Sequence, residues 1–109
     1  MIDYVEESTV FKALCEPTRL KILDMLSCGE MCACVMLESL SITQPTLSHH
    51  MKVLMECDLI SGRKDSTWMY YSIRRDRVEE LHRFIDFLIN TKEVCICKSV
   101  HNDCSSDAN

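Results

Sequence analysis

Eight cysteines stand out in a chain of 109 residues, because thiols are the side chains here with the most chemistry to offer. Cys32 and Cys34 lie two positions apart, and three more lie near the carboxyl end: Cys95, Cys97 and Cys104. A thiolate is a soft ligand that prefers soft, thiophilic metal ions. In a reducing compartment a free thiol can also act as a redox sensor, or simply as a small apolar residue. The two groups are therefore candidate thiol sites, with metal binding and redox sensing both open.

The rest of the composition argues against a secreted fold held by disulfides. Hydrophobic residues make up 47 %, and only two glycines and two prolines are present, so the chain can build its own core. The amino-terminal sequence MIDYVEES lacks the basic start and apolar core of a signal peptide. No apolar run reaches the roughly 20 residues that a membrane helix needs. We therefore expect a cytoplasmic protein with free thiols and no membrane partner.

Apolar periodicity and capping residues predict a mainly α-helical chain with one small β-hairpin. The helices are expected over about Tyr4–Leu14, from near Pro17 to Gly29 or shortly before it, over Cys32–Leu40, from the cap Thr43 to Glu56, and over Asp76–Asn90. The stretch from Leu59 to Ile73, with a polar middle and an aromatic second half, is typical of a hairpin. We expect a dimeric winged helix-turn-helix domain over residues 1–92, for DNA binding and dimerisation, and a cysteine-containing tail over residues 93–109.

The periodicity also assigns individual side chains to the core or to the surface. The second helix is expected to bury the stripe Leu20, Ile22, Leu23 and Leu26. Cys15 and Cys57 are expected in the core. His50 is expected to be partly buried with a hydrogen bond, and His82 to face solvent.

Two short helices, a tight turn and a hairpin define a winged helix-turn-helix, whose second helix enters the major groove of DNA. The candidate DNA contacts on that helix and on the hairpin are Gln44, Thr46, Ser48, His49, Lys52, Arg63 and Lys64. Glutamine can pair with adenine through two hydrogen bonds, and hairpin cations can reach phosphate. The net charge of −5 opposes DNA binding, but residues 41–77 carry six basic and four acidic side chains. An ordinary amphipathic helix with a solvated polar face fits the same pattern.

Three motifs together resemble the ArsR/SmtB family of repressors over about residues 9–73. They are Phe11-Lys12-Ala13-Leu14 with Glu16-Pro17-Thr18-Arg19, the run from Thr43 to Leu54, and the aromatic Trp68-Met69-Tyr70-Tyr71. The resemblance implies a homodimer joined through the first and last helices, a double-stranded DNA operator as partner, and no enzymatic activity. Pro45 departs from the small residue usual at that position, which leaves the fold intact and the set of base contacts open.

The run from Glu30 to Cys34 resembles the arsenic- and cadmium-type sensor box of the same family. This resemblance implies that Cys32 and Cys34 bind trivalent arsenic or another thiophilic ion as inducer, and that the repressor then leaves its operator. Arsenite takes three sulfurs, but Leu37 occupies the position of the usual third cysteine, so the third ligand stays open. Residues two apart on a helix point about 200° apart, so both sulfurs can bind one ion only if the helix start unwinds.

Other readings of the thiols remain. A redox-sensing repressor would use the same cysteines by oxidation, and a cadmium- or lead-type sensor would use them for another ion. A sequestering protein would bind metal without sequence-specific DNA affinity. A zinc-type site is disfavoured because Glu80 and His82 are not followed by a suitably spaced histidine. With two glycines and no nucleophile–base motif, nothing in the sequence supports an enzyme.

Overall fold

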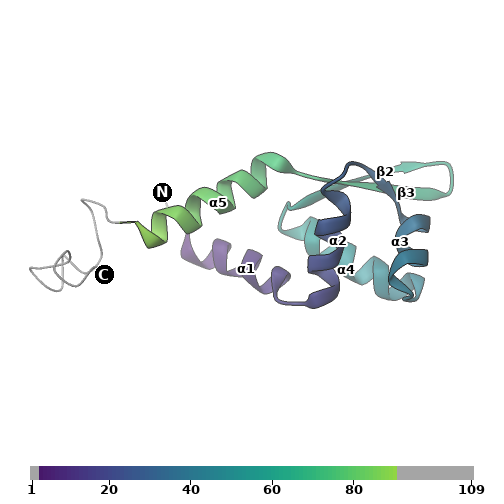
Figure 1. Ribbon diagram of the computed structural model, residues 1–109, viewed down its shortest axis with the longest axis horizontal. Helices are drawn as coiled ribbons and strands as arrows, with labels where there is room; N and C mark the ends of the chain where they lie inside the picture. Colours follow the sequence, from purple (N-terminus) through teal and green to yellow (C-terminus); the bar gives the residue numbers. More distant parts are fainter. Residues whose placement is uncertain (1–2, 91–109) are drawn as a thin grey trace, which may run out of the picture. The chain divides into compact units, whose positions relative to one another are not determined.

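The computed structural model describes residues 3–90 of the chain. They fall into two units with the boundary between Val78 and Glu79, inside the last helix, and each unit is described by itself. The expected tail at residues 93–109 lies outside the described residues. Within the first unit the order is α1, α2, β1, α3, α4, β2 and β3, followed by the start of α5 (Figure 1).

The first two helices begin where their caps predict. Helix α1 spans Tyr4–Leu14, and the carboxylate of Asp3 accepts hydrogen bonds from the first free N–H groups of the helix at 3.1 and 3.0 Å. Helix α2 spans Pro17–Leu26 and is capped by Glu16, whose carboxylate accepts from the main-chain N–H of Arg19 at 3.0 Å. Both predicted helices are confirmed.

The third and fourth helices form the helix-turn-helix. Helix α3 spans Ala33–Leu40 and ends at Ser41, which adopts a left-handed φ of 55°. Helix α4 spans Gln44–Glu56, and the hydroxyl of Thr43 accepts from the main-chain N–H of Thr46 at 3.3 Å. The predicted turn and the Thr43 cap are therefore confirmed.

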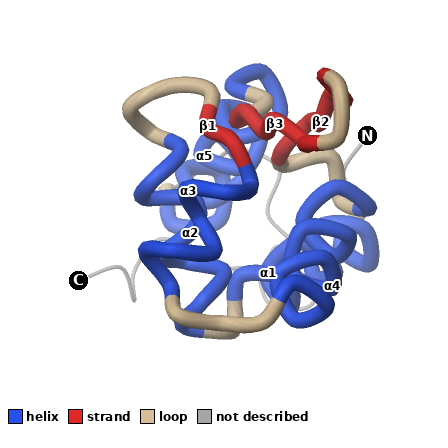
Figure 2. Tube along the Cα trace, turned by 90° about the vertical axis from the view of Figure 1, so that its right-hand side faces the viewer, coloured by secondary structure: helices blue, strands red, loops and turns tan. Residues whose placement is uncertain are grey.

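The predicted hairpin is confirmed, but it belongs to a three-stranded antiparallel sheet. Strands β2 (Ile60–Asp65) and β3 (Trp68–Ile73) form the hairpin, and β1 (Met31–Cys32) pairs with the other edge of β3. Figure 2 shows the three strands next to one another. A strand of two residues is too short to leave a periodic pattern, so the sequence did not predict it.

This third strand corrects the start of the third helix. Cys32 was expected to be its first residue, but the helix begins at Ala33 and Cys32 is its cap. The backbone of Cys32 is extended, with φ −74° and ψ 141°, because the residue still belongs to the β1–β3 ladder. The sensor box thus straddles the change from strand to helix.

The core of the described residues draws on every helix of the first unit and on the start of β2. Its most completely buried side chains are Val10, Ile22, Leu26, Met36, Met51, Leu54, Leu59 and Ile60. Two expectations were wrong. Leu20 is 52 % exposed, because it lies two positions before Ile22 and so on the other side of α2. Cys15 is exposed, because α1 ends at Leu14 and the cysteine lies in the turn that follows.

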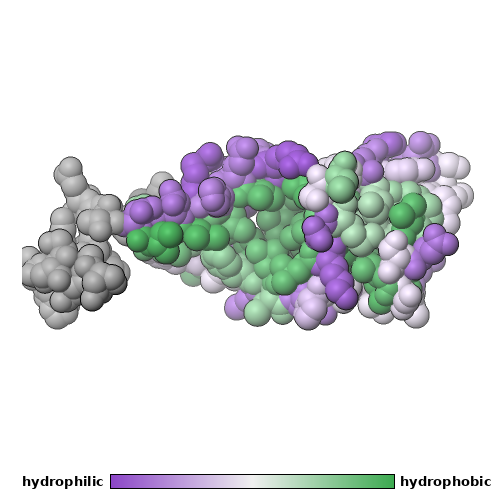
Figure 3. All heavy atoms as spheres, viewed as in Figure 1, coloured by the Kyte–Doolittle hydropathy of each residue, from purple (hydrophilic) through white to green (hydrophobic). Residues whose placement is uncertain are grey.

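Helix α5 spans Arg75–Ile89, close to its predicted range. Figure 3 shows hydrophilic residues along one edge of this helix and hydrophobic residues along the other. Val78, Ile85, Leu88 and Ile89 are its exposed large apolar side chains. Within the first unit, Arg77 pairs with Glu7 of α1 at 3.1 Å. Among residues 3–90 no helix is long and apolar enough to cross a membrane.

Candidate DNA interface and thiol site

Helix α4 has a buried side and a polar side. Its inward side chains are Leu47, His50, Met51 and Leu54, at the spacing of one helix face. The sequence-predicted DNA contacts Gln44, Thr46, Ser48, His49 and Lys52 are all exposed on it. The hydroxyl of Thr46 lies 2.9 Å from the hydroxyl of Thr43, so it already takes part in the cap of the helix. Helix α4 therefore offers an amide, hydroxyls, an imidazole and a cation to a partner.

His50 fixes the other side of α4 to the rest of the domain, as expected for a partly buried histidine. Its Nδ1 lies 3.2 Å from a guanidinium nitrogen of Arg19 on α2. The Nε of Arg19 also donates to the carbonyl of Ala13 at 2.6 Å, so one arginine ties α4 to α2 and to the end of α1. Burial lowers the pKa of His50, and the positive charge of Arg19 lowers it further against the pull of Glu16.

The wing brings two exposed cations, Arg63 and Lys64, onto β2. Arg63 is held on three sides. Its guanidinium donates two hydrogen bonds of 2.8 Å to the carboxylate of Glu30, lies 3.6 Å from Asp65, and sits 4.8 Å above the ring of Tyr70. The hydrogen bonds with Arg63 lower the pKa of the Glu30 carboxyl. The wing arginine is therefore positioned by the loop that leads into the sensor box.

Cys32 and Cys34 lie together without any unwinding of α3. Because Cys32 is the cap, its Sγ turns back over the first turn and accepts from the main-chain N–H of Cys34 at 3.3 Å. The 200° separation holds for two residues inside a helix. Cys32 lies before the helix, so the premise that both cysteines are helical was wrong.

The surroundings favour the thiolate form of Cys32. Burial alone would raise the pKa of this thiol, but hydrogen bonds from Cys34 and from main-chain N–H groups outweigh it, and the pKa is lowered. The Tyr70 side chain also hydrogen-bonds Cys32 and adds to the lowering. The pKa of Cys34 is raised, first by its hydrogen bond to Cys32. Of the two sulfurs, Cys32 therefore ionises more readily than an ordinary thiol and Cys34 less readily.

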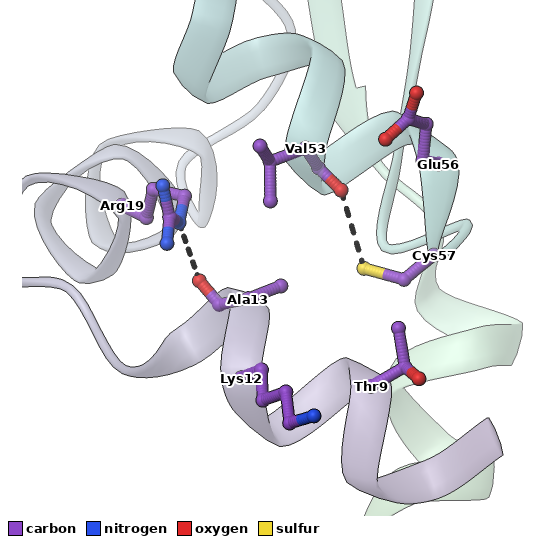
Figure 4. A pocket seen from close by; sticks show the side chains of 7 residues that line it. All are labelled: Thr9, Lys12, Ala13, Arg19, Val53, Glu56 and Cys57. Carbon is purple, nitrogen blue, oxygen red and sulfur yellow. Dashed lines mark hydrogen bonds between the residues drawn. The ribbon is translucent and has the colours of Figure 1, made fainter. Parts of the chain in front are cut away.

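Cys57 has a different setting, at the pocket of about 270 Å³ drawn in Figure 4. The pocket lies between α1, Arg19 and the end of α4, and is lined by Thr9, Lys12, Ala13, Arg19, Val53, Glu56 and Cys57. The Cys57 thiol points to the carbonyls of Val53 and Leu54, at 3.6 and 3.5 Å. Burial raises the pKa of Cys57. Cys57 was expected in the core and is half-buried, and with its raised pKa it is a poor ligand.

The sequence-predicted sites are thus partly assembled in the described residues. Cys32 and Cys34 meet, and the α4 side chains share one exposed side. In residues 3–90 no group of three or more cysteine, histidine or acidic side chains could hold a metal ion. Cys95, Cys97 and Cys104 lie outside the described residues. Sequence reasoning placed Glu30 in the sensor box without a role and missed Tyr70 as a member of the site, because the β1–β3 pairing had no sequence signal.

Comparison with known proteins agrees with this fold and with a DNA-binding role for the helix-turn-helix. Residues 16–61, from the cap of α2 into β2, match the model for bacterial regulatory proteins of the arsR family. An arsenical resistance operon repressor from Staphylococcus aureus is 40 % identical over 104 residues, which is 94 % of this chain and 100 % of that protein. The chain belongs to the arsR family of bacterial regulatory proteins.

Two further relatives extend this family assignment. A cadmium resistance transcriptional regulatory protein homologue from Staphylococcus aureus is 35 % identical, over 71 % of this chain and 64 % of its own length. A homodimeric winged helix-turn-helix DNA-binding domain from Mycobacterium bovis has a TM-score of 0.63 and 28 % identity, over 76 % of this chain and 77 % of that one. The winged helix-turn-helix predicted from the sequence is therefore confirmed, in a family of DNA-binding regulators.

Proposed function

We propose that this arsR-family chain is a transcriptional repressor that binds operator DNA as a homodimer and leaves it when Cys32 and Cys34 capture a thiophilic ion. The observation that carries the proposal is the sulfur of Cys32 at the first turn of α3, within reach of Cys34. Helix α3 is the first helix of the helix-turn-helix and leads directly into α4. A ligand on these two sulfurs therefore acts on the helix that supports the DNA-reading helix.

Trivalent arsenic is the inducer that the donor set and the relatives favour. Two soft sulfurs, one of them with a lowered pKa, suit a soft acceptor. Relatives named as arsenical resistance operon repressors include the one with 40 % identity, while a cadmium-type relative keeps cadmium or lead as the alternative ion. The third ligand can come from solvent or from Cys95, Cys97 or Cys104.

The DNA side of the proposal uses the outer side of α4 and the wing. Exposed Gln44, Ser48 and His49 are suited to base edges. Thr46 sits beside the cap, and Lys52, Arg63 and Lys64 are suited to phosphates. The dimer would form through α1 and α5, whose exposed apolar side chains include Val5 at 76 % and Leu88 at 47 %.

A thiol-based redox repressor is the second candidate. A lowered pKa at Cys32 beside a protonated Cys34 is also the arrangement that an oxidant attacks. The two candidates differ in one requirement: an ion sensor responds under strict reduction, and a redox sensor needs an oxidant.

The test is a mobility-shift titration of the full chain, in reductant, on DNA upstream of its own gene, with arsenite, cadmium and zinc added in turn. We expect specific binding without an ion, release by arsenite or cadmium, and little effect of zinc. Equal binding to any duplex would reject the repressor. Release only after the reductant is replaced by an oxidant would move the assignment to the redox candidate.

A further inference from the structure

One row of side chains crosses the sheet from the thiol site to the wing. In the β1–β3 ladder Cys32 lies opposite Tyr70, and in the β2–β3 ladder Tyr70 lies opposite Arg63. Directly opposed residues of antiparallel strands point to the same face of the sheet. A sensor thiol, a phenol and a wing guanidinium are therefore neighbours in space, although 31 positions separate Cys32 from Arg63.

The members of this row lie against one another. Tyr70 lies directly opposite Cys32 in the β1–β3 ladder, and each of these two side chains shifts the pKa of the other. The guanidinium carbon of Arg63 lies 4.8 Å from the centre of the same tyrosine ring, a distance at which a cation is attracted to the ring face. One side chain thus links the proposed ion ligand and the proposed DNA contact.

Glu30 provides a second link between Cys32 and Arg63. Its carboxylate holds Arg63 by two hydrogen bonds of 2.8 Å, and it lies two residues before Cys32 on the chain. A shift of β1 can therefore reach Arg63 by two routes, one through the Glu30 carboxylate and one through the Tyr70 ring.

Capture of an ion changes what the Cys32 sulfur can offer to Tyr70. Phenylarsine oxide is a simple probe, because its arsenic stays trivalent and bonds two sulfurs. Two arsenic–sulfur bonds form. Cys32 reacts as the thiolate, so the oxide oxygen leaves as water with the Cys34 thiol proton and one proton from solvent, and nothing is oxidised or reduced. The sulfur then donates a lone pair to arsenic and loses its negative charge. A neutral, bonded sulfur is a much weaker acceptor for the tyrosine hydroxyl.

We propose that Tyr70 is the positioning residue through which occupation of Cys32 is transmitted to Arg63 on the wing. The inference rests on the proposed function. In the empty protein the sulfur holds the hydroxyl, and the ring supports the guanidinium in the place set by Glu30. In the loaded protein that hydroxyl contact is lost, the ring moves, and Arg63 no longer lies where the operator backbone requires it.

The test uses Tyr70→Phe, which removes the hydroxyl and keeps the ring, in the full chain under reductant. The matched control is Tyr71→Phe, the same deletion at the next residue, whose buried side chain points to the opposite face of the strand. The quantity is the ratio of operator Kd with and without saturating phenylarsine oxide. We expect a wild-type ratio within the roughly 5–150-fold range of coupled sites. The ratio should fall several-fold in Tyr70→Phe and stay unchanged in Tyr71→Phe.

Three readouts distinguish a coupling role of Tyr70 from a purely structural one. Probe capture, counted by mass, should be the same in both variants as in the wild-type chain. The tyrosine difference spectrum on probe binding should vanish in Tyr70→Phe alone. A double-mutant cycle with Arg63→Ala should be non-additive, because both residues lie on one path. Should Tyr70→Phe fail to fold, Glu30→Gln against Asp65→Asn replaces it, with the ratio expected to fall only in Glu30→Gln.

The outcomes are distinct. A wild-type ratio in Tyr70→Phe with intact capture overturns the coupling role and leaves the proposed function standing. The proposed function, and the coupling with it, is overturned if the probe does not change operator binding by the wild-type protein. It is also overturned if the probe still releases the operator from Cys32→Ser/Cys34→Ser. An equal fall of the Kd ratio in both tyrosine variants would show a general effect of the strand, and it would also overturn the specific role of Tyr70.

Discussion

Arg19 on α2 donates a hydrogen bond to Nδ1 of His50 on α4, with 3.2 Å between the two nitrogens. The contact requires an unprotonated Nδ1, so the inner side of the DNA-reading helix is held by a neutral imidazole. Because burial lowers the pKa of His50 in the folded chain, the unfolded chain takes up a proton that the native chain resists.

Stability is therefore expected to fall as pH drops below about 6.5, the ordinary range of histidine. The free energy of unfolding in urea should fall less between pH 7.5 and pH 5.0 in His50→Gln than in wild type. The amide oxygen of the glutamine can still accept a hydrogen bond from Arg19. His49→Gln, on the exposed side of α4, is the control and should behave as wild type. Equal pH dependence in His50→Gln and wild type would contradict the neutral, buried role of His50.

The core prediction compares two apolar residues of α2. Ile22 is fully buried and Leu20 is 52 % exposed, two positions earlier. Ile22→Ala should lower the free energy of unfolding by about 2–5 kcal/mol, since it removes buried methylenes and leaves a cavity. Leu20→Ala should change it by roughly 0.5 kcal/mol or less. Similar losses in a denaturant titration would place Leu20 in the core, as the sequence pattern alone predicted.

The DNA prediction separates base contacts from phosphate contacts. Ser48→Ala and His49→Ala should lower the preference for operator over random duplex by about tenfold each, because they remove groups suited to base edges. Lys64→Ala should weaken both duplexes alike and reduce the salt slope by about one. Fluorescence anisotropy over a salt series measures both. The operator should be an imperfect palindrome with half-sites about 10 base pairs apart. A reversed pattern, with Lys64 setting preference, would refute this assignment.

The dimer prediction concerns α5. Ile85 and Leu88 are 39 % and 47 % exposed in one chain, which leaves apolar side chains for a second copy to cover. Ile85→Glu/Leu88→Glu should give monomers in light scattering, with much weaker operator binding, because two reading helices act together in a dimer. Glu79→Lys, on an exposed polar position of the same helix, is the control. Wild-type protein that is monomeric at micromolar concentration would refute the dimer.

The sequence predicted most of the fold because its caps and its helical periods agree. Asp3, Glu16 and Thr43 mark helix starts that a local pattern can show, and Thr43 is the cap of the proposed DNA-reading helix α4. The exposure of Leu20 could not be predicted, because several stripes of α2 are equally apolar and only packing selects one.

The thiol site shows where sequence reasoning ends. The spacing of Cys32 and Cys34 predicted a site, but their geometry depends on a two-residue strand that ends the helix one position early. The roles of Glu30 and Tyr70 depend on pairing between strands about 40 residues apart, which no local pattern encodes. Long-range register, and not residue type, decides which groups surround the sulfur.

The most direct test of the thiol switch compares two variants, both in reductant. One is Cys32→Ser/Cys34→Ser and the other is the chain truncated after Lys92, which removes Cys95, Cys97 and Cys104. The measurement is the arsenite concentration that releases half of the bound operator. Loss of response in both variants would show that the tail supplies a required ligand to the Cys32–Cys34 pair. The account predicts that the double serine variant binds the operator and no longer responds, while the truncated chain is still released by arsenite. A truncated chain that no longer responds, beside a double serine variant that does, would contradict it and place the sensor in the tail.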